Sequence, residues 1–320
     1  MTRPRRIGRH RSSPRRPVPT PTSAIFIRSL WYASAKRMMT VRSVGEFLSA
    51  VGNIRREWRL RRFNELWFRA EDQPYRRTHL QPQLYRPRKS GKRKSVDKLL
   101  EIENCLYGEF RRCGTQLTDT NAIDDEWDSY FLMQHHGVPT RLLDWSDGAL
   151  ISLHFAVRDK PMPPRSGSLI YILDPYWLMK FQRDTGDRKD AARRWADYSK
   201  KVESDWDVDE WERLYLPIDS DDAKEPLLAT PASPLLWDSA HVTRRVAAQR
   251  SRFMIFGTDP SWLMGMSKDK TARLTSISVP RGAIDQIRRE LRDAGVTESV
   301  IYPDLDGLGR ELKQFWELRR

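Results

Sequence analysis

Residues 134–146 read QHHGVPTRLLDWS and place charged, polar and aromatic side chains around a glycine and a proline, just before an apolar stretch. Asp and Arg are rarely buried without a partner, whereas the two leucines between Arg141 and Asp144 are typical of a core. Core packing alone does not require this mixture. The segment therefore predicts a turn in which Arg141 pairs with Asp144, buried or half-buried beside a cleft.

Other residues of this segment suit a turn after a helix. Gly137 fits the position that follows a helix end, and Pro139 prevents the helix from continuing. Thr140 and Asp144 can hydrogen-bond the local backbone. Trp145 has no role in such a turn, and an amphipathic ring of this kind often stacks on a base or a nicotinamide. The segment thus also predicts a ligand pocket.

Two further positions carry groups that could do chemistry or bind a ligand. His135 ends the preceding helix, where the helix dipole favours an imidazolium by about 0.3–1 kcal/mol. We expect His135 to titrate near neutrality. It could then serve as an acid or base, or it could only cap the helix. Arg245 and Gln249 are four residues apart and share one helical face. They could clamp a carbonyl or phosphate, or cap their own helix.

Four ordered blocks of the sequence resemble the FRG domain family of bacteria and phages, which is named for an aromatic-Arg-Gly signature. The blocks are 67–70 (WFRA), 134–146, 244–253 (RRVAAQRSRF) and 302–308 (YPDLDGL). Ala70 and Ser251 stand where the family has glycine. The resemblance implies one FRG domain over residues 44–320. Within it, residues 184–225 are rich in Asp and Glu and are predicted to be a helical insertion, where the resemblance is weakest.

The first block is also similar to the opening motif of arginine-specific ADP-ribosyltransferases, in which the Arg binds a dinucleotide phosphate. The resemblance implies that Arg69 binds a phosphate, which a guanidinium can meet with two parallel bonds, and that NAD is the substrate. An ion pair of Arg69 with Asp144 or another carboxylate is the alternative. Those enzymes have a decisive Glu in their third motif, where this chain has Gln249, so a carboxylate would come from Glu71 or Asp144.

The spacing of apolar residues predicts helices over about 44–61, 96–112, 123–136, 147–157, 283–294 and 305–318, and strands over 66–69, 168–173, 253–256 and 274–279. Helices and strands do not alternate regularly. We therefore expect an α+β fold, in which a single mixed domain has a small β-sheet surrounded by helices. The sheet is either continuous or split into two parts.

The net charge of +14 is distributed unevenly along the chain. Eleven of the 57 Lys and Arg residues and none of the 43 Asp and Glu residues lie up to Gly45, so 46 basic and 43 acidic residues remain. Residues 1–43 are predicted to be a disordered basic arm. The arm resembles a transit peptide; alternatively, the sequence starts too early and Met38 or Met39 is the true first residue. The arm and the basic run Arg88–Lys94 could bind nucleic acid non-specifically.

Several classes of protein and site are excluded by pattern. No run reaches the roughly 20 apolar residues that a membrane span needs. Cys105 and Cys113 lie eight apart on one predicted helix, which prevents them from pairing and gives no zinc spacing. We therefore expect a cytoplasmic protein without a metal site. Phosphate loops of the Walker and dinucleotide types, GxSxG and HExxH are absent.

These observations predict one cleft. Its expected lining comprises the catalytic candidates His135 and Asp144 and the ligand-binding candidates Arg69, Thr140, Arg141, Trp145, Arg245 and Gln249. Two function classes remain open. The first is a nucleotide-using, ADP-ribosyltransferase-like enzyme that acts as a toxin or phage-defence effector, which the clustering of reactive groups favours. The second is a non-catalytic module that senses a nucleotide or binds nucleic acid, which the missing third-motif Glu favours.

Overall fold

The computed structural model describes residues 39–316 apart from 73–78, 88–93, 118–124, 159–166, 186–188, 191, 195, 198–210, 218–229, 238–242, 268 and 270. The basic arm, most of the basic run that begins at Arg88 and most of segment 184–225 lie outside the described residues. The predictions for those segments therefore stay predictions.

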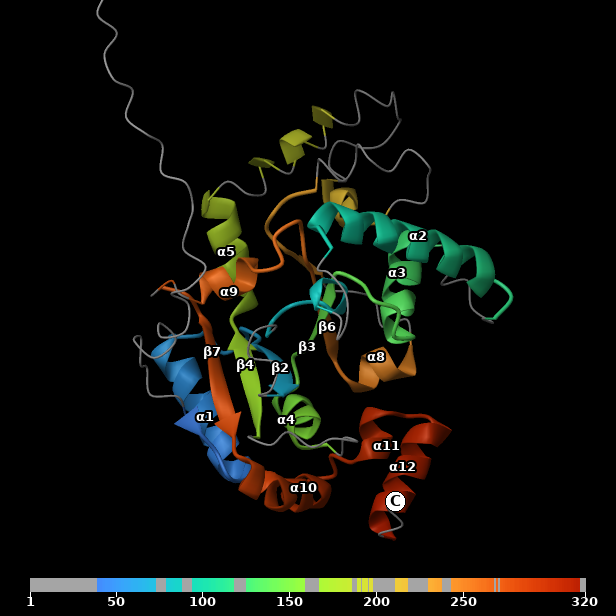
Figure 1. The fold of residues 1–320 in the computed structure, drawn as a ribbon. Coiled ribbons are helices and arrows are strands. Elements are labelled where there is room, and N and C mark those ends of the chain that lie inside the picture. Colours follow the sequence, from blue (N-terminus) through green and yellow to red (C-terminus); the bar gives the residue numbers. More distant parts are fainter. Residues whose placement is uncertain are drawn as a thin grey trace, which may run out of the picture. The chain divides into compact units, whose positions relative to one another are not determined.

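Seven strands form one open sheet in the order β1-β7-β4-β2-β3-β6-β5 (Figure 1). They are β1 (Met39–Thr40), β2 (Trp67–Asp72), β3 (Leu142–Ser146), β4 (Ser168–Leu173), β5 (Leu235–Trp237), β6 (Ser251–Ile255) and β7 (Leu274–Val279). β1 runs parallel to β7, and the other neighbouring strands are antiparallel. The mixed architecture confirms the predicted α+β class.

The sheet is divided between β2 and β3. These two strands pair only at Phe68 and Ser146, whereas β2 pairs with β4 from Trp67 to Asp72 and β3 pairs with β6 along its whole length. Two halves of the sheet, β1-β7-β4-β2 and β3-β6-β5, therefore meet where most of a regular ladder is missing. We call this boundary the β2–β3 seam.

Helices cover both faces of the sheet. They are α1 (Val44–Glu57), α2 (Val96–Gly114), α3 (Glu126–His135), α4 (Ala149–Val157), α5 (Pro175–Thr185), α8 (Arg244–Ala248), α9 (Trp262–Met266), α10 (Ile284–Asp293), α11 (Glu298–Ile301) and α12 (Leu305–Phe315), with 3-10 turns η3 (Gln83–Tyr85), η5 (Trp211–Tyr215) and η6 (Arg281–Ala283). α1, α2, α3, α4, α10 and α12 agree with the predicted helices to within a few residues at most ends. No helix in the described ranges could cross a membrane.

Three apolar clusters form the core, and their arrangement leaves the seam uncovered on one side. Phe68 belongs to a cluster with α1, α4 and α10, and Leu142 and Phe253 belong to a second one with α2, α3 and η5. Both clusters lie on the same face of the sheet, one on each half. On the opposite face a third cluster spans the seam through Trp67 and Trp145.

Residues 142–146 are strand β3 and not the turn that the sequence predicts. The strand is stabilised by five register pairs with β6, and its side chains alternate between the two faces of the sheet. Because Arg141 and Asp144 are three positions apart on extended backbone, their side chains point to opposite faces. The predicted pairing of Arg141 with Asp144 is therefore wrong.

Candidate functional site

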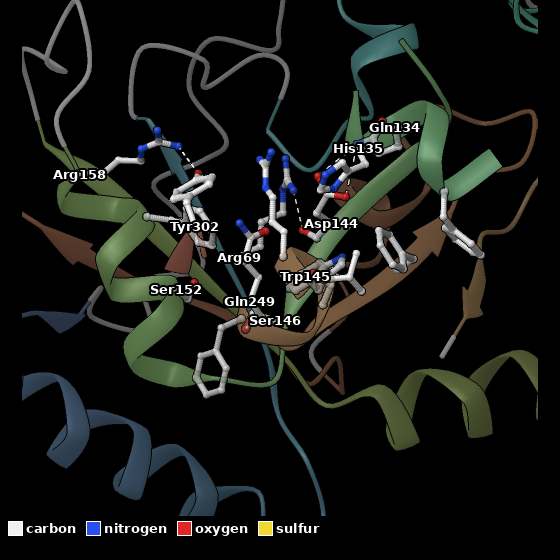
Figure 2. A pocket seen from close by; sticks show the side chains of 18 residues that line it. Arg69, Gln134, His135, Asp144, Trp145, Ser146, Ser152, Arg158, Gln249 and Tyr302 are labelled. Carbon is white, nitrogen blue, oxygen red and sulfur yellow. Dashed lines mark hydrogen bonds between the residues drawn. The ribbon is translucent and has the colours of Figure 1, made fainter. Parts of the chain in front are cut away.

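A cavity of about 310 Å³ lies at the β2–β3 seam, and residues of β2, β3, α3, α4 and α8 line it (Figure 2). Six of the eight predicted site residues line it: Arg69, His135, Asp144, Trp145, Arg245 and Gln249. Aromatic side chains supply much of the remaining wall: Phe68, Phe131, Phe155, Phe253 and Tyr302. Thr140 and Arg141 are fully or almost fully buried and do not line the cavity.

Arg69 reaches across the seam from β2 to β3. Its Nη1 donates a hydrogen bond to the main-chain oxygen of Asp144 (2.6 Å), and its Nε donates to Glu71 Oε1 (2.8 Å). Glu71 is buried and also accepts from the backbone N–H of Leu80 (3.2 Å). The ion pair that the sequence left open is therefore present, but its carboxylate is Glu71 and not Asp144.

The Asp144 carboxylate is exposed at the cavity and is held by a chain of hydrogen bonds. Gln134 Nε2 donates to its two oxygens at 3.1 and 3.3 Å, and Gln134 Oε1 accepts from Thr140 Oγ1 at 2.5 Å. Thr140 Oγ1 in turn accepts from the backbone N–H of Leu142 (3.2 Å). Because Thr140 directs the amide NH₂ of Gln134 toward the carboxylate, it is a positioning residue and not a ligand contact.

His135 is half-buried in the cavity wall. Burial, followed by the positive charge of Arg245, lowers its pKa from 6.5 to about 4. The helix dipole favours the imidazolium by about 0.3–1 kcal/mol, which would raise the pKa of His135 by less than one unit, since one unit corresponds to about 1.36 kcal/mol. Burial and the charge of Arg245 therefore outweigh the dipole. The ring is neutral at pH 7, and the expectation that His135 titrates near neutrality is wrong.

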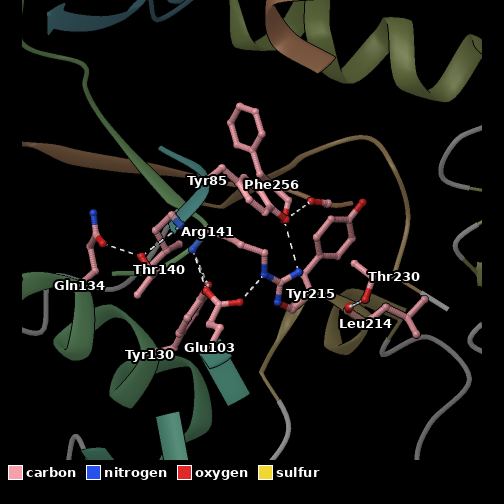
Figure 3. A network of polar contacts seen from close by, with 12 residues as sticks. Tyr85, Glu103, Tyr130, Gln134, Thr140, Arg141, Leu214, Tyr215, Thr230 and Phe256 are labelled. Carbon is pink, nitrogen blue, oxygen red and sulfur yellow. Dashed lines mark hydrogen bonds and ion pairs between the residues drawn. The ribbon is translucent and has the colours of Figure 1, made fainter. Parts of the chain in front are cut away.

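Arg141 is buried in a polar network behind β3 (Figure 3). Its backbone N and its Nε donate to the Glu103 carboxylate at 2.7 and 2.5 Å, and its Nη2 donates to the main-chain oxygen of Tyr215 (2.7 Å). Tyr130 donates its hydroxyl to the same carboxylate (2.6 Å). Arg141 therefore joins β3 to α2, α3 and η5, and the prediction that it binds the ligand is not supported by its position.

Tyr302, just after α11, forms the opposite end of the cavity and is surrounded by arginines. The guanidinium carbons of Arg245, Arg310 and Arg158 lie 4.7, 4.8 and 5.0 Å from the centre of its ring. Arg158 Nη1 also donates to the Tyr302 hydroxyl (2.5 Å). Sequence reasoning named Tyr302 only as part of a family block and missed Arg158, which lies 144 positions earlier.

Glu298 balances part of this charge. It accepts from Arg310 Nε at 2.7 Å, and it lies 3.1 Å from His154 Nε2 and 3.7 Å from Arg158 Nη2. Burial opposes ionisation of Glu298, but the hydrogen bonds from His154 and Arg310 and the charge of Arg158 outweigh it and lower its pKa to about 2. Glu298 is therefore a stable anion that anchors α11 to α4 and α12.

Gln249 lines the cavity mainly as a structural group. Its Nε2 donates to the main-chain oxygen of Ile301 (3.3 Å), and its own main-chain oxygen accepts from Ser146 Oγ (2.7 Å). These bonds hold α8, β3 and α11 together around the cavity. Over the part of the chain that the structure describes, no group of three or more His, Cys, Asp or Glu side chains could hold a metal ion.

The FRG domain family model matches residues 64–163 of this chain. Comparisons with curated proteins and with solved structures find no significant match. The matched region contains Arg69, His135, Asp144 and Arg158, and the cavity is completed by α8 and Tyr302 from further along the chain. The match agrees with the resemblance of the sequence blocks and shows that the chain contains an FRG domain.

Proposed function

We propose that the cavity binds a nucleotide and that the protein transfers ADP-ribose from NAD, as ADP-ribosyltransferase-like enzymes do. The observation that carries this proposal is that Arg69 and Asp144, which are 75 positions apart in sequence, line one cavity together with aromatic rings and further arginines. A volume of about 310 Å³ is at the lower end of small-molecule sites, which are mostly apolar with a few placed polar groups.

The lining provides the two kinds of contact that a nucleotide needs. Phe131, Phe155 and Phe253 offer apolar and aromatic surface to a base or a nicotinamide. Guanidinium groups offer charge-assisted hydrogen bonds to phosphate oxygens. The Asp144 carboxylate, which Gln134 holds at the cavity surface, can accept hydrogen bonds from ribose hydroxyls.

The proposed reaction exchanges the group on C1′ of the nicotinamide ribose. The bond from C1′ to the nicotinamide nitrogen breaks, and nicotinamide leaves with the bonding electron pair. The negative charge of Asp144 stabilises the cationic ribose, and the acceptor nucleophile bonds to C1′ as it gives up a proton. His135 is the cavity residue that would accept that proton: its ring is unprotonated at pH 7, although its pKa of about 4 makes it a weak base.

The test combines calorimetry with NAD and detection of released nicotinamide by liquid chromatography. We expect the wild type to bind NAD and release nicotinamide. The Asp144→Asn variant, which keeps the size of the side chain, should lose nicotinamide release, whereas Asp306→Asn makes the same change at an exposed site outside the cavity lining and should not. If neither NAD nor ADP binds, the proposal is wrong.

A non-catalytic nucleotide sensor is the second candidate function. It is favoured by the fact that Asp144 is the only carboxylate among the described residues that line the cavity, and no Glu lines it. Binding of NAD without release of nicotinamide, in the presence of candidate acceptor proteins, would support the sensor and exclude the transferase.

The biological setting that we propose is a toxin or phage-defence effector in the cytoplasm, which rests on the family resemblance. An active effector of this kind should slow the growth of a bacterial host when it is expressed. Asp144→Asn should relieve that effect at equal protein levels, and equal growth inhibition by both proteins would contradict a role for the cavity.

A further inference from the structure

We propose that Arg245, Arg158 and Ser152 form a phosphate-binding subsite at the Tyr302 end of the cavity, and that this subsite, and not Arg69, receives the phosphate of the ligand. The inference rests on the proposed nucleotide function and says where the phosphate of that nucleotide lies. The ligand chemistry is a phosphate or diphosphate group.

The first support is a local excess of positive charge. Arg158, Arg245 and Arg310 surround Tyr302, and Glu298 pairs with Arg310 and Arg158. Arg245 forms no ion pair or side-chain hydrogen bond within the ranges that the structure describes. Asp304 also acts on His135, so the three guanidinium charges around Tyr302 exceed the two carboxylates Glu298 and Asp304, and a bound anion would reduce that excess.

Arg245 is placed so that it can donate. It lines the cavity from α8, and its guanidinium carbon lies 4.7 Å from the ring centre of Tyr302. Stacking on a ring uses the face of a guanidinium and leaves the N–H groups at its edge for an acceptor. The charge of Arg245 is also felt inside the cavity, where it contributes to the low pKa of His135.

The second support is a pair of buried polar atoms without partners on α4 and at its end. Ser152 is 1% exposed and lines the cavity, and its Oγ makes no hydrogen bond to any residue that the structure describes. Arg158 Nε, six residues along, is also buried and has no hydrogen-bond partner among those residues. Ser152 and Arg158 lie at the Tyr302 side of the cavity (Figure 2). Buried polar groups are nearly always hydrogen-bonded in proteins, so a missing ligand is a physical reason for both exceptions.

Arg69 is the less suitable phosphate group because two of its three nitrogens already donate hydrogen bonds. Its Nε and Nη1 have acceptors, and its charge is matched by the buried Glu71 carboxylate. A phosphate bound there would approach Glu71 and compete with the bond to Asp144 that spans the seam. We therefore assign Arg69 to holding the two strands together.

The test is calorimetry at fixed ionic strength with four probes: inorganic pyrophosphate, ADP, adenosine and a short single-stranded DNA. Arg245→Gln is compared with Arg244→Gln, which removes the same charge from the neighbouring, exposed position of α8. We expect Arg245→Gln to weaken pyrophosphate and ADP about tenfold or more, as the loss of a charge-assisted hydrogen bond does. Arg244→Gln should change either affinity less than about twofold, and Arg245→Lys should recover part of the loss.

The outcomes separate this inference from the proposed function. Two results would overturn the subsite while leaving nucleotide binding intact. One is an equal affinity of Arg245→Gln and Arg244→Gln for ADP, and the other is an equal affinity of the wild-type protein for adenosine and for ADP. Pyrophosphate binding that depends on Arg245, without binding of ADP or NAD, would support the subsite and overturn the nucleotide proposal. DNA binding that depends on Arg245 would identify a nucleic-acid phosphate as the source, and no pyrophosphate binding at millimolar concentration would overturn the subsite.

Discussion

Replacing Glu103 with Gln should be among the most destabilising single changes in this protein. The Glu103 carboxylate is 0% exposed, Arg141 is 2% exposed, and Glu103 accepts hydrogen bonds from two nitrogens of Arg141 and from the hydroxyl of Tyr130. Gln keeps the shape of the side chain but removes the charge, and it can place an NH₂ group against donors. The guanidinium of Arg141 would then be a buried charge whose remaining partners are the main-chain oxygens of Tyr215 and Phe256.

Leaving one partner of a buried ion pair uncompensated costs about 3–5 kcal/mol. Domains of this size are stable by about 5–15 kcal/mol, so Glu103→Gln should remove a large share of the free energy of unfolding. At about 2–4 °C per kcal/mol, the melting temperature should fall by roughly 6–20 °C.

Urea unfolding followed by circular dichroism at pH 7 measures this free energy, and a thermal melt gives an independent value. Glu101→Gln is the matched control, because Glu101 pairs with Lys98 on the exposed side of the same helix and such pairs contribute about 1 kcal/mol or less. A loss below about 1 kcal/mol for Glu103→Gln, or equal losses for the two variants, would show that the Arg141–Glu103 pair is not desolvated and that the network of Figure 3 is not a main support of the fold.

Four further predictions concern the site and the arm. Between about pH 4 and 6.5 the unfolded chain should bind a proton at the His135 position that the folded protein does not; the free energy of unfolding should therefore fall on acidification through this window, and His135→Asn should flatten that dependence in urea titrations. Asp144→Asn should shift the melting temperature by no more than about 2 °C, because the carboxylate is exposed and has no cationic partner among the described residues; a loss of 3 kcal/mol would mean that the carboxylate is buried in solution. Thr140→Val should cost about 1–3 kcal/mol, since it leaves Leu142 N–H and Gln134 without a buried partner, and should weaken NAD binding in calorimetry while Thr140→Ser restores it. Any nucleic-acid binding should be sequence-independent and fall steeply with salt, and affinity retained after removal of residues 1–37 and substitution of the basic residues of Arg88–Lys94 by Ser would contradict this.

Local sequence patterns predicted the helices and strands of this fold better than they predicted which of these elements pair with each other. Helix α1 and its Ser43 cap follow from apolar spacing and one side-chain acceptor, which act within a few residues. β3 was mistaken for a turn because Pro139, Thr140 and Asp144 have strong local turn preferences. Pairing with β6, more than 100 residues later, outweighs those preferences, and a single sequence does not contain that information in any local pattern.

The site was predicted in part for the same reason. The family blocks mark Arg69, Asp144 and Tyr302, and the structure brings these together at one cavity. Glu103 was missed, although a charged residue between Leu99, Leu100 and Tyr107 on the apolar face of α2 was an available signal of a buried ion pair. Its partner could not be identified from spacing, because several arginines were equally placed in sequence and only tertiary packing selects Arg141.

The β2–β3 seam also links ligand binding to the cohesion of the whole sheet. Because the strands share the single pair of Phe68 and Ser146, backbone hydrogen bonds do little to fix the separation of the two halves at the cavity. A ligand that contacts both β2 and β3 would supply bridging contacts that the ladder lacks. Its binding free energy would therefore raise the free energy that is needed to open the sheet along the seam. The backbone amides of β2 and β3 that point into the seam should therefore exchange with solvent faster in the free protein than those between β4 and β7, and they should slow selectively when the cavity is filled.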